Sequence, residues 1–253
     1  MPQGDEYGQE YTDRQAGRSR LRKVMRRPWL RAAAGFVEGP AIDLGCGVGE
    51  LLERLPAGSM GLEINRASVA HCRAKGLDVT YYDGWADDWR LSAVCDAVRA
   101  RGGTLAPATA RNASDPDSVD PGSDSGPDLA DPDADSGPDL ADPGRSRGDG
   151  TFDTLIMSHV LEHLDDPVDV LHRLLGTAGP LGLRQVLIVV PGRAGFRSQE
   201  THRTFVDRAM LSDAAVTRDT GFVLASTSYF PGNLRRIGDV FLYHELRASY
   251  VRL

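Results

Sequence analysis

The sequence predicts an open α/β fold in which a mostly parallel sheet of seven strands carries helices on both faces. Short apolar strands alternate with helical segments along the chain, and this alternation favours parallel strands joined by helices. A run of β-branched residues at 185–190 is typical of a strand buried on both faces. A glycine-rich turn directly after the strand at 41–44 predicts a ligand site at the carboxyl ends of the strands.

Apolar periodicity, glycines and capping residues place the expected elements along the chain. Strands are expected at 41–44, 61–63, 77–82, 152–158, 185–190, 222–229 and 243–252. Helices are expected to open at 50–53, directly after the glycine turn, and to span 66–75, 88–101, 167–175 and 207–220. Asp207 is the expected cap of the last helix, and Gly221 its stop.

The segment 103–150 interrupts this pattern. It contains two copies of the sequence DSGPDLADP, and its eleven aspartates against three arginines give it a charge of −8, so the rest of the chain carries +1 of the net charge of −7. A segment with so few large apolar side chains cannot offset the entropy of ordering, so we expect a disordered insertion. The expected organisation is a basic helical segment or lid at 1–40, followed by one domain at 41–253 that is interrupted at 103–150.

The glycine turn is the most informative stretch of the chain. Glycines at 45, 47 and 49 allow positive φ and let a ligand approach the backbone. Asp43 precedes the turn, and a carboxylate there would repel a pyrophosphate but suits a cationic ligand. Glu63 ends the next strand 20 residues after Asp43, the interval at which nucleotide folds place a carboxylate on ribose hydroxyls.

The same turn argues against a dinucleotide. The dinucleotide fingerprint needs a small residue where this chain has Glu50, because helix and strand pack closely there. S-adenosylmethionine carries an ammonium and a sulfonium group and no phosphate. The electrostatics of Asp43 therefore favour S-adenosylmethionine over NAD.

Residues 43–49 and Glu63, together with the segment 152–164, resemble class I S-adenosylmethionine-dependent methyltransferases, most of all the methyltransferase type 11 branch. The resemblance implies a Rossmann-like fold and methyl transfer to an O, N or C nucleophile of a small-molecule or lipid- or sugar-linked acceptor. By position, the implied cofactor site consists of Asp43, Gly45, Cys46, Gly47, Glu63, Asp83 and Ser158. Asp83 would face the adenine amino group, although an Asp-Gly pair after a strand is also ordinary turn chemistry.

Two histidines are the candidate catalytic residues. His159 follows Ser158 at the end of the fourth strand, where side chains of this fold meet cofactor and substrate, so it is the first candidate for a general base. His202 lies in the loop after the fifth strand, which faces the substrate in similar family members, and is the second. The plain alternatives are that His159 only packs or orients its loop and that His202 is an exposed loop residue.

Two other classes of function stay open. His159-x-x-Glu162-His163 matches an inverted zinc-peptidase pattern, which needs a long helix with both histidines on one face. A strand leads directly into His159 and a new element begins at Pro167, so no metal ligands are expected. The third class is a cofactor-binding module that lost activity.

Composition indicates the compartment and the partners. The first fifteen residues are polar, no segment has the ~18 apolar residues of a membrane span, and the three cysteines lie apart, so the cytoplasm is expected. Basic residues in the segment 1–40 fit either a solvated helix or an arm that recruits an anionic or lipid-linked acceptor at a membrane surface. Nucleic acid is not expected as a partner. Tyr7 and Tyr11 are candidates to close over the cofactor.

Overall fold

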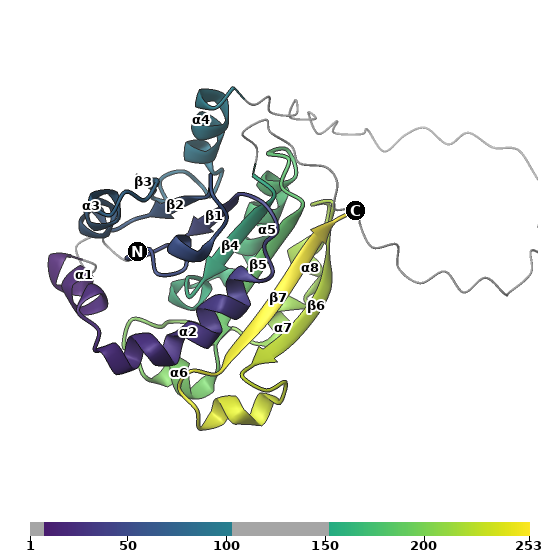
Figure 1. Ribbon diagram of the computed structural model, residues 1–253. Helices are drawn as coiled ribbons and strands as arrows, with labels where there is room; N and C mark the ends of the chain where they lie inside the picture. Colours follow the sequence, from purple (N-terminus) through teal and green to yellow (C-terminus); the bar gives the residue numbers. More distant parts are fainter. Residues whose placement is uncertain (1–7, 103–151) are drawn as a thin grey trace, which may run out of the picture.

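The computed structural model describes residues 8–102 and 152–253. Within these residues the chain forms one seven-stranded sheet of order β3-β2-β1-β4-β5-β7-β6, in which only β7 runs antiparallel to its neighbours (Figure 1). The strands are β1 (Ala41–Leu44), β2 (Met60–Glu63), β3 (Val79–Tyr81), β4 (Thr154–Ser158), β5 (Gln185–Pro191), β6 (Phe222–Phe230) and β7 (Glu245–Arg252). The predicted open, mostly parallel α/β sheet is confirmed. The insertion predicted at 103–150 and Tyr7 lie outside the described residues.

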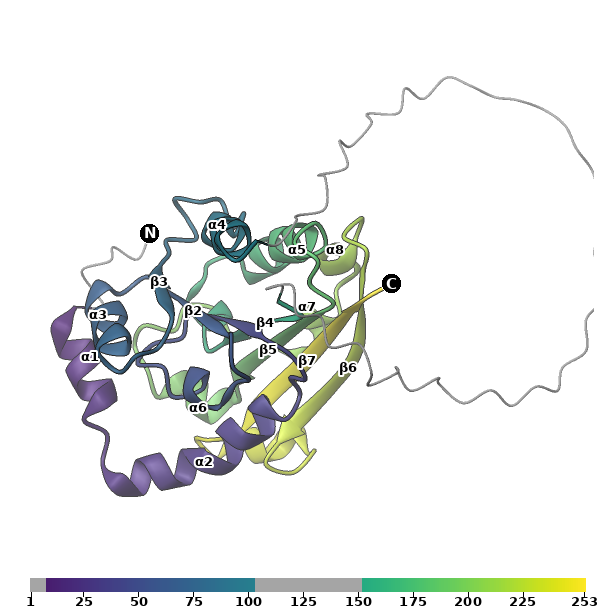
Figure 2. The same ribbon diagram turned by 45° about the horizontal axis from the view of Figure 1, so that its top comes forward.

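Helices cover both faces of this sheet. The α-helices are α1 (Gln9–Ala16), α2 (Arg20–Ala34), α3 (Arg66–Ala74), α4 (Ser92–Ala100), α5 (Pro167–Ala178), α6 (Arg193–Arg197), α7 (Arg208–Leu211) and α8 (Ala214–Thr217). Short 3-10 helices are η2 (Leu52–Arg54), η3 (Leu161–His163) and η4 (Arg235–Asp239). In Figure 2, α4, α5 and α8 lie on one side of the sheet, and α2 and α3 on the other.

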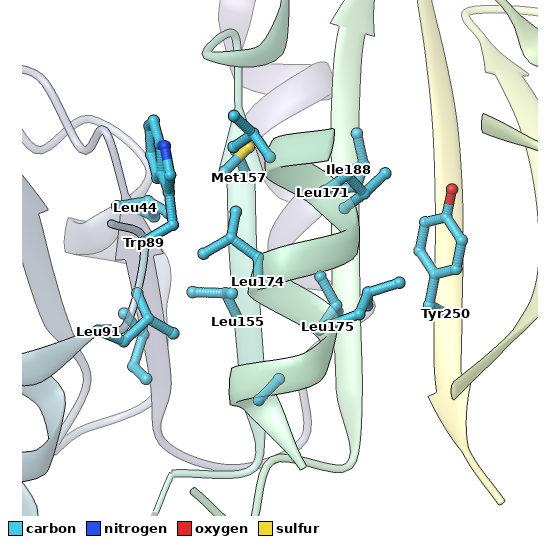
Figure 3. Close-up of a cluster of buried hydrophobic side chains, with 14 of the residues drawn as sticks. Leu44, Trp89, Leu91, Leu155, Met157, Leu171, Leu174, Leu175, Ile188 and Tyr250 are labelled. Carbon is cyan, nitrogen blue, oxygen red and sulfur yellow. The ribbon is translucent and has the colours of Figure 1, made fainter. Parts of the chain in front are cut away.

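The larger core lies under α5. Pro167 occupies the first turn of this helix, and the Asp166 side chain accepts a hydrogen bond from the backbone N–H of Asp169 at 3.0 Å, so both residues fix where the helix begins. Its apolar side packs on β4 and β5 through Leu155, Met157, Leu171, Leu174, Leu175 and Ile188 (Figure 3). This packing holds the carboxyl end of β4 in place.

A second core lies under α2 on the opposite face. Trp29, Leu30 and Ala33 pack against Leu187 and Val189 of β5, and all five side chains are buried. Because α2 follows α1 directly, this contact carries the N-terminal segment across the carboxyl edge of the sheet, as Figure 2 shows. The segment is thus part of the site's surroundings.

The predicted helix directly after the glycine turn is wrong. Only the three-residue η2 forms there, and Leu55 is already extended, with φ −76° and ψ 157°. Leu55 precedes Pro56, and the proline ring disfavours helical backbone in the residue before it. The helical backbone between β1 and β2 therefore ends after a single short turn, before Pro56.

Two other predicted helices begin later or break. The helix predicted from residue 88 begins at Ser92, because Asp88, Trp89 and Leu91 have positive φ. The helix predicted over 207–220 divides into α7 and α8, since the side chain of Asp213 caps a new helix at the backbone N–H of Ala215, 2.8 Å away.

Candidate functional site

The glycine turn after β1 brings its backbone to the ligand side of the sheet. Gly45 has φ +77°, and a Cβ there would lie 2.4 Å from Cγ2 of Val160, so that position has no room for a side chain. Gly47 has φ +56°, and a Cβ there would meet no atom within 4 Å. The backbone at Gly47 is therefore open to a ligand, as the sequence predicts.

Glu63 at the end of β2 stabilises this turn through hydrogen bonds. One carboxylate oxygen accepts the backbone N–H of Gly47 at 2.7 Å and the other accepts that of Asn65 at 2.8 Å. Burial raises the pKa of Glu63, and the hydrogen bonds from Asn65 and Gly47 offset part of that rise. Each oxygen still has a further lone pair with which it can accept a ribose hydroxyl.

Asp43 lies buried beside Glu63. Its Oδ2 has no hydrogen-bond partner among the described residues. Burial and then the charge of Glu63 raise the pKa of Asp43 from 3.8 to about 7. A buried carboxylate of this kind is stabilised by a cation, so the pair of acids can hold the positive end of a ligand.

We expect this carboxyl to make cofactor affinity depend on pH. Because the pKa of Asp43 is raised from 3.8 to about 7, this carboxyl stays protonated in the folded, cofactor-free protein below about pH 7. The free energy of unfolding therefore declines as pH rises from about 4 to about 7. A cationic cofactor prefers the ionised form, so its affinity should fall about tenfold for each pH unit below about 7. Calorimetric titration with S-adenosylmethionine between about pH 5.5 and about pH 8.5 measures this slope. Asp43→Asn should bind weakly with no such slope, and an unchanged slope in this variant would contradict the assignment.

The other predicted cofactor residues lie at the same edge. Ser158 is the last residue of β4, paired with Val189. The Oδ1 atom of Asp83 accepts the backbone N–H groups of Trp85 at 3.0 Å and Ala86 at 3.2 Å, which is the turn chemistry considered from the sequence. Its other carboxylate oxygen can still accept from an amino group.

Cys46 and Cys72 come together behind the turn. Both thiols donate to the carbonyl of Gly47, that of Cys72 at 3.3 Å and that of Cys46 at 3.9 Å. All three cysteines, Cys95 included, are free thiols. Their separation in sequence gives no sign of this contact, which supports the backbone of the turn from α3.

The N-terminal helix α1 docks on the same edge. The Asn65 amide donates to the hydroxyl of Thr12 at 3.1 Å and to the carbonyl of Gly8 at 3.3 Å, and the hydroxyls of Thr12 and Ser68 lie 2.9 Å apart. Burial and then the charge of Glu63 raise the pKa of Tyr11 on α1. These contacts place α1 against the carboxyl end of β2.

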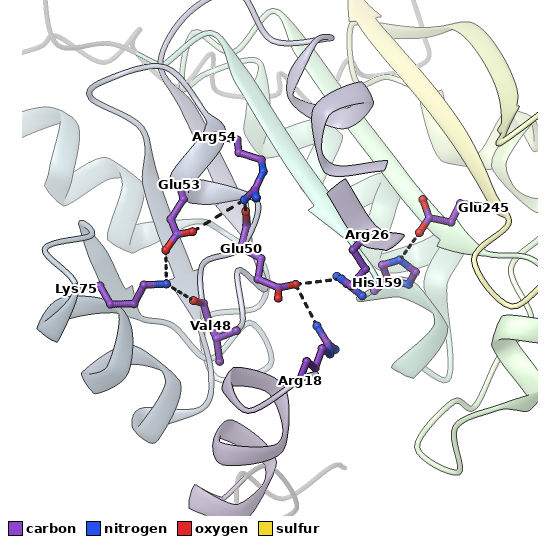
Figure 4. A network of polar contacts seen from close by, with 9 residues as sticks. All are labelled: Arg18, Arg26, Val48, Glu50, Glu53, Arg54, Lys75, His159 and Glu245. Carbon is purple, nitrogen blue, oxygen red and sulfur yellow. Dashed lines mark hydrogen bonds and ion pairs between the residues drawn. The ribbon is translucent and has the colours of Figure 1, made fainter. Parts of the chain in front are cut away.

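Ion pairs connect the glycine turn to the N-terminal segment. The Glu50 carboxylate lies 3.1 Å from Nη1 of Arg18 and 3.0 Å from Nε of Arg26 (Figure 4). A cavity of about 350 Å³ lies beside these pairs, with Val48, Glu50 and Arg27 among its lining residues. Glu50, which excludes the dinucleotide pattern, is thus an anchor for the segment that contains α1 and α2.

His159 sits between two carboxylates. It has φ +57°, its Nδ1 lies 3.0 Å from Glu162, and its Nε2 lies 3.0 Å from Glu245 of β7. Burial lowers the pKa of His159, but the hydrogen bonds and charges of Glu162 and Glu245 outweigh this and raise it to about 9. At neutral pH both ring nitrogens therefore donate, and neither can accept a proton.

His202 lies behind His159, in the loop after α6. Its side chain is only 1% exposed, and its Nδ1 lies 2.8 Å from the carbonyl of Phe196. Burial lowers the pKa of His202. The His202 side chain is thus buried, so it is not the exposed loop histidine that the sequence left open as the plain alternative.

The zinc-peptidase geometry does not form in this part of the described chain. His159 has a left-handed backbone, and η3, which contains Glu162 and His163, spans only three residues. The pattern needs both histidines on one face of a long helix. The structure therefore lacks the long helix that the zinc-peptidase alternative requires.

Buried polar atoms without partners gather between α2 and β7. Among the described residues, Nε1 of Trp29, Oε2 of Glu245, and Nε and Nη2 of Arg247 have no hydrogen-bond partner. The guanidinium of Arg247 is 4.4 Å from the ring centroid of Phe230 and only 4% of the residue is exposed. Sequence reasoning missed Glu245 and Arg247, although charges at alternate positions of a predicted strand are a detectable signal.

The comparisons with known proteins agree with this geometry. A family model described as a methyltransferase domain matches residues 17–225. A structure of a SAM-dependent methyltransferase from Archaeoglobus fulgidus is similar to this chain, with a TM-score of 0.52 at 16% identity, and covers 95% of this chain and 97% of that chain. The protein that a Haloferax volcanii structure shows in complex with the Trm112 methyltransferase activator has a TM-score of 0.52 at 14% identity, with 98% and 96% covered. A comparison with curated proteins finds no match.

No helix of the described residues has both the length and the apolar character needed to cross a membrane. The matched domain contains the glycine turn, both carboxylates and His159. The chain belongs to the class I S-adenosylmethionine-dependent methyltransferases, and S-adenosylmethionine is its cofactor.

Proposed function

We propose that this protein transfers a methyl group to an O, N or C nucleophile of a small-molecule or lipid- or sugar-linked acceptor, in the cytoplasm. The observation that carries the proposal is the buried pair Asp43 and Glu63 beside the open backbone of Gly47, which suits a cationic adenosyl ligand. Free thiols at all three cysteines support a reducing compartment.

The acceptor site that fits best lies between α2, the carboxyl end of β4 and the amino end of β7, which runs antiparallel. A buried guanidinium with two nitrogens that lack hydrogen-bond partners is costly, so an anionic group on the acceptor that met Arg247 would relieve that cost. Glu245 links this place to the end of β4 through its contact with His159. We therefore propose an acceptor that carries a carboxylate or a phosphate.

Methyl transfer from a sulfonium requires the protein mainly to align the acceptor with the methyl group. The sulfonium is a good leaving group, so the site must orient the nucleophile in line with the methyl carbon and exclude water. His159 and His202 were the residues expected to remove a proton. We propose instead that His159 positions Glu162 and Glu245 through its two ring nitrogens. Oε2 of Glu245 lacks a partner and burial raises the pKa of Glu245, so this carboxylate is the group proposed to accept the proton of a hydroxyl or carbon acid.

Labelled S-adenosylmethionine tests this proposal. The protein is incubated with methyl-labelled cofactor and an extract of host metabolites, and labelled products are identified by mass spectrometry. We expect one dominant anionic product. For that acceptor, Arg247→Ala should raise KM about tenfold or more without changing the Kd of the cofactor, whereas Arg184→Ala, at the exposed amino end of β5, should change neither. No labelled product in any extract would instead favour a cofactor-binding module that lacks activity.

A further inference from the structure

Glu162, His163 and His202 form a cluster beside the methyl-transfer site. Glu162 and His163 belong to η3 after β4, and His202 comes from the loop after α6. One ligand atom from each of the three residues can be chosen so that all lie within 4.8 Å of one another. The cluster thus joins two segments that are about 40 residues apart in sequence.

Backbone carbonyls fix the tautomers of both histidines. Nδ1 of His163 lies 3.0 Å from the carbonyl of Thr201, and Nδ1 of His202 lies 2.8 Å from that of Phe196. A carbonyl oxygen only accepts hydrogen bonds, so Nδ1 carries the proton in each ring and Nε2 of the neutral ring carries the lone pair. Histidines that bind metals are commonly oriented by such a bond from the other nitrogen.

Two acceptor atoms of the cluster are buried. Nε2 of His202 and Oε2 of Glu162 have no hydrogen-bond partner among the described residues, and both side chains are at most 1% exposed. Nε2 of His202 lies 3.9 Å from Oε1 of Glu162, which is too far for a hydrogen bond. Ligands on one tetrahedral zinc ion, with bonds of about 2.0–2.2 Å, lie about 3.4 Å apart, so small side-chain movements would bring these atoms onto one ion.

We propose that Glu162, His163 and His202 bind one divalent transition metal ion, with Zn²⁺ the best fit. Two imidazoles and one carboxylate are a ligand set that zinc accepts, whereas Mg²⁺ and Ca²⁺ prefer oxygen ligands. This site differs from the zinc-peptidase pattern, because His202 takes the place of His159.

The ion would tie the loop after α6 to the end of β4. The carbonyl of Glu162 already accepts hydrogen bonds from the backbone N–H groups of Arg203 at 2.8 Å and Thr204 at 3.1 Å. The metal would therefore strengthen an existing contact between η3 and the loop after α6. Oε1 of the same Glu162 holds His159. A metal at this position would therefore stabilise the wall that carries His159, and its role is structural.

Metal binding to the full chain, expressed without a histidine tag, tests the proposal without any activity assay. After EDTA treatment and dialysis, we expect calorimetry to find one Zn²⁺ per chain, and Tm to rise by about 5 °C or more when free Zn²⁺ is about a hundredfold above Kd, with no response to Mg²⁺. Co²⁺ in place of Zn²⁺ should give visible absorption bands. Zn²⁺ should also slow tryptic cleavage at the exposed Arg197 and Arg203.

Matched variants decide whether the ion sits in this cluster. His202→Gln should weaken Zn²⁺ binding about a hundredfold or more, whereas His172→Gln, on α5 and with its Nδ1 at the carbonyl of Val216, should leave it unchanged. If His202→Gln fails to fold, His163→Gln replaces it, because His163 is only half-buried, and it should weaken Zn²⁺ binding in the same way. No Zn²⁺ binding by the wild-type chain, or equal binding by the His202, His163 and His172 variants, would overturn the proposal. Because every readout is metal binding or stability, failure here leaves the proposed methyl transfer untouched.

Discussion

Replacing Gly47 by alanine is expected to weaken S-adenosylmethionine binding about a hundredfold or more, equivalent to about 2.7 kcal/mol, while the protein still folds. The added Cβ meets no protein atom within 4 Å, so the fold loses only the cost of a left-handed alanine at φ +56°, about 1 kcal/mol. The open space it would occupy is the space proposed for the cofactor. Calorimetric titration gives the affinity, and thermal unfolding gives the stability.

Gly76→Ala is the matched control for this variant. Gly76 follows α3 with φ +78°, and a Cβ there also meets nothing within 4 Å. Both alanine variants should therefore lose similar stability, and only the one at Gly47 should lose the cofactor. Equal affinities in the two variants would place the ligand away from the glycine turn.

Glu63→Ala is expected to have an effect at least as large, because it removes two kinds of interaction at once. The ribose hydroxyls lose their proposed acceptor, and the backbone N–H groups of Gly47 and Asn65 lose theirs, at 2.7 Å and 2.8 Å. Hydrogen bonds to a charged group contribute about 1.5–3 kcal/mol each, so we expect a loss of affinity of about a hundredfold to a thousandfold.

The measurement is again a calorimetric titration, with circular dichroism to show that the sheet persists. Glu38→Ala removes an exposed carboxylate outside the site and should change neither quantity. Cofactor affinity within a factor of about two of the wild type in Glu63→Ala would remove Glu63 from the ribose site.

The part of the site formed by neighbours in sequence could be predicted from the residues. Asp43, the glycines and Glu63 lie in one β–turn–β unit, where the interval between strands fixes which side chains meet. The start of α5 could also be predicted from the sequence, because Asp166 and Pro167 are capping signals that act over one turn.

The contacts that cross the sheet could not be predicted in the same way. His159 meets Glu245 across 86 residues, and which strand pairs beside β5 decides that contact. The β7 strand enters antiparallel between β5 and β6, so residues near the end of the chain reach the carboxyl edge. The role proposed for His159 differs from the predicted one for the same reason: the second carboxylate in contact with its ring comes from β7.

The docking of α1 has a consequence for the reaction cycle. Thr12 and Tyr11 lie against the end of β2, next to the carboxylate proposed to hold the ribose, and Glu50 clamps the following segment through Arg18 and Arg26. If α1 covers the cofactor site in this position, we expect it to slow the departure of S-adenosylhomocysteine. We therefore expect the rate at which α1 lifts to limit turnover, with the methylation step itself faster than product release.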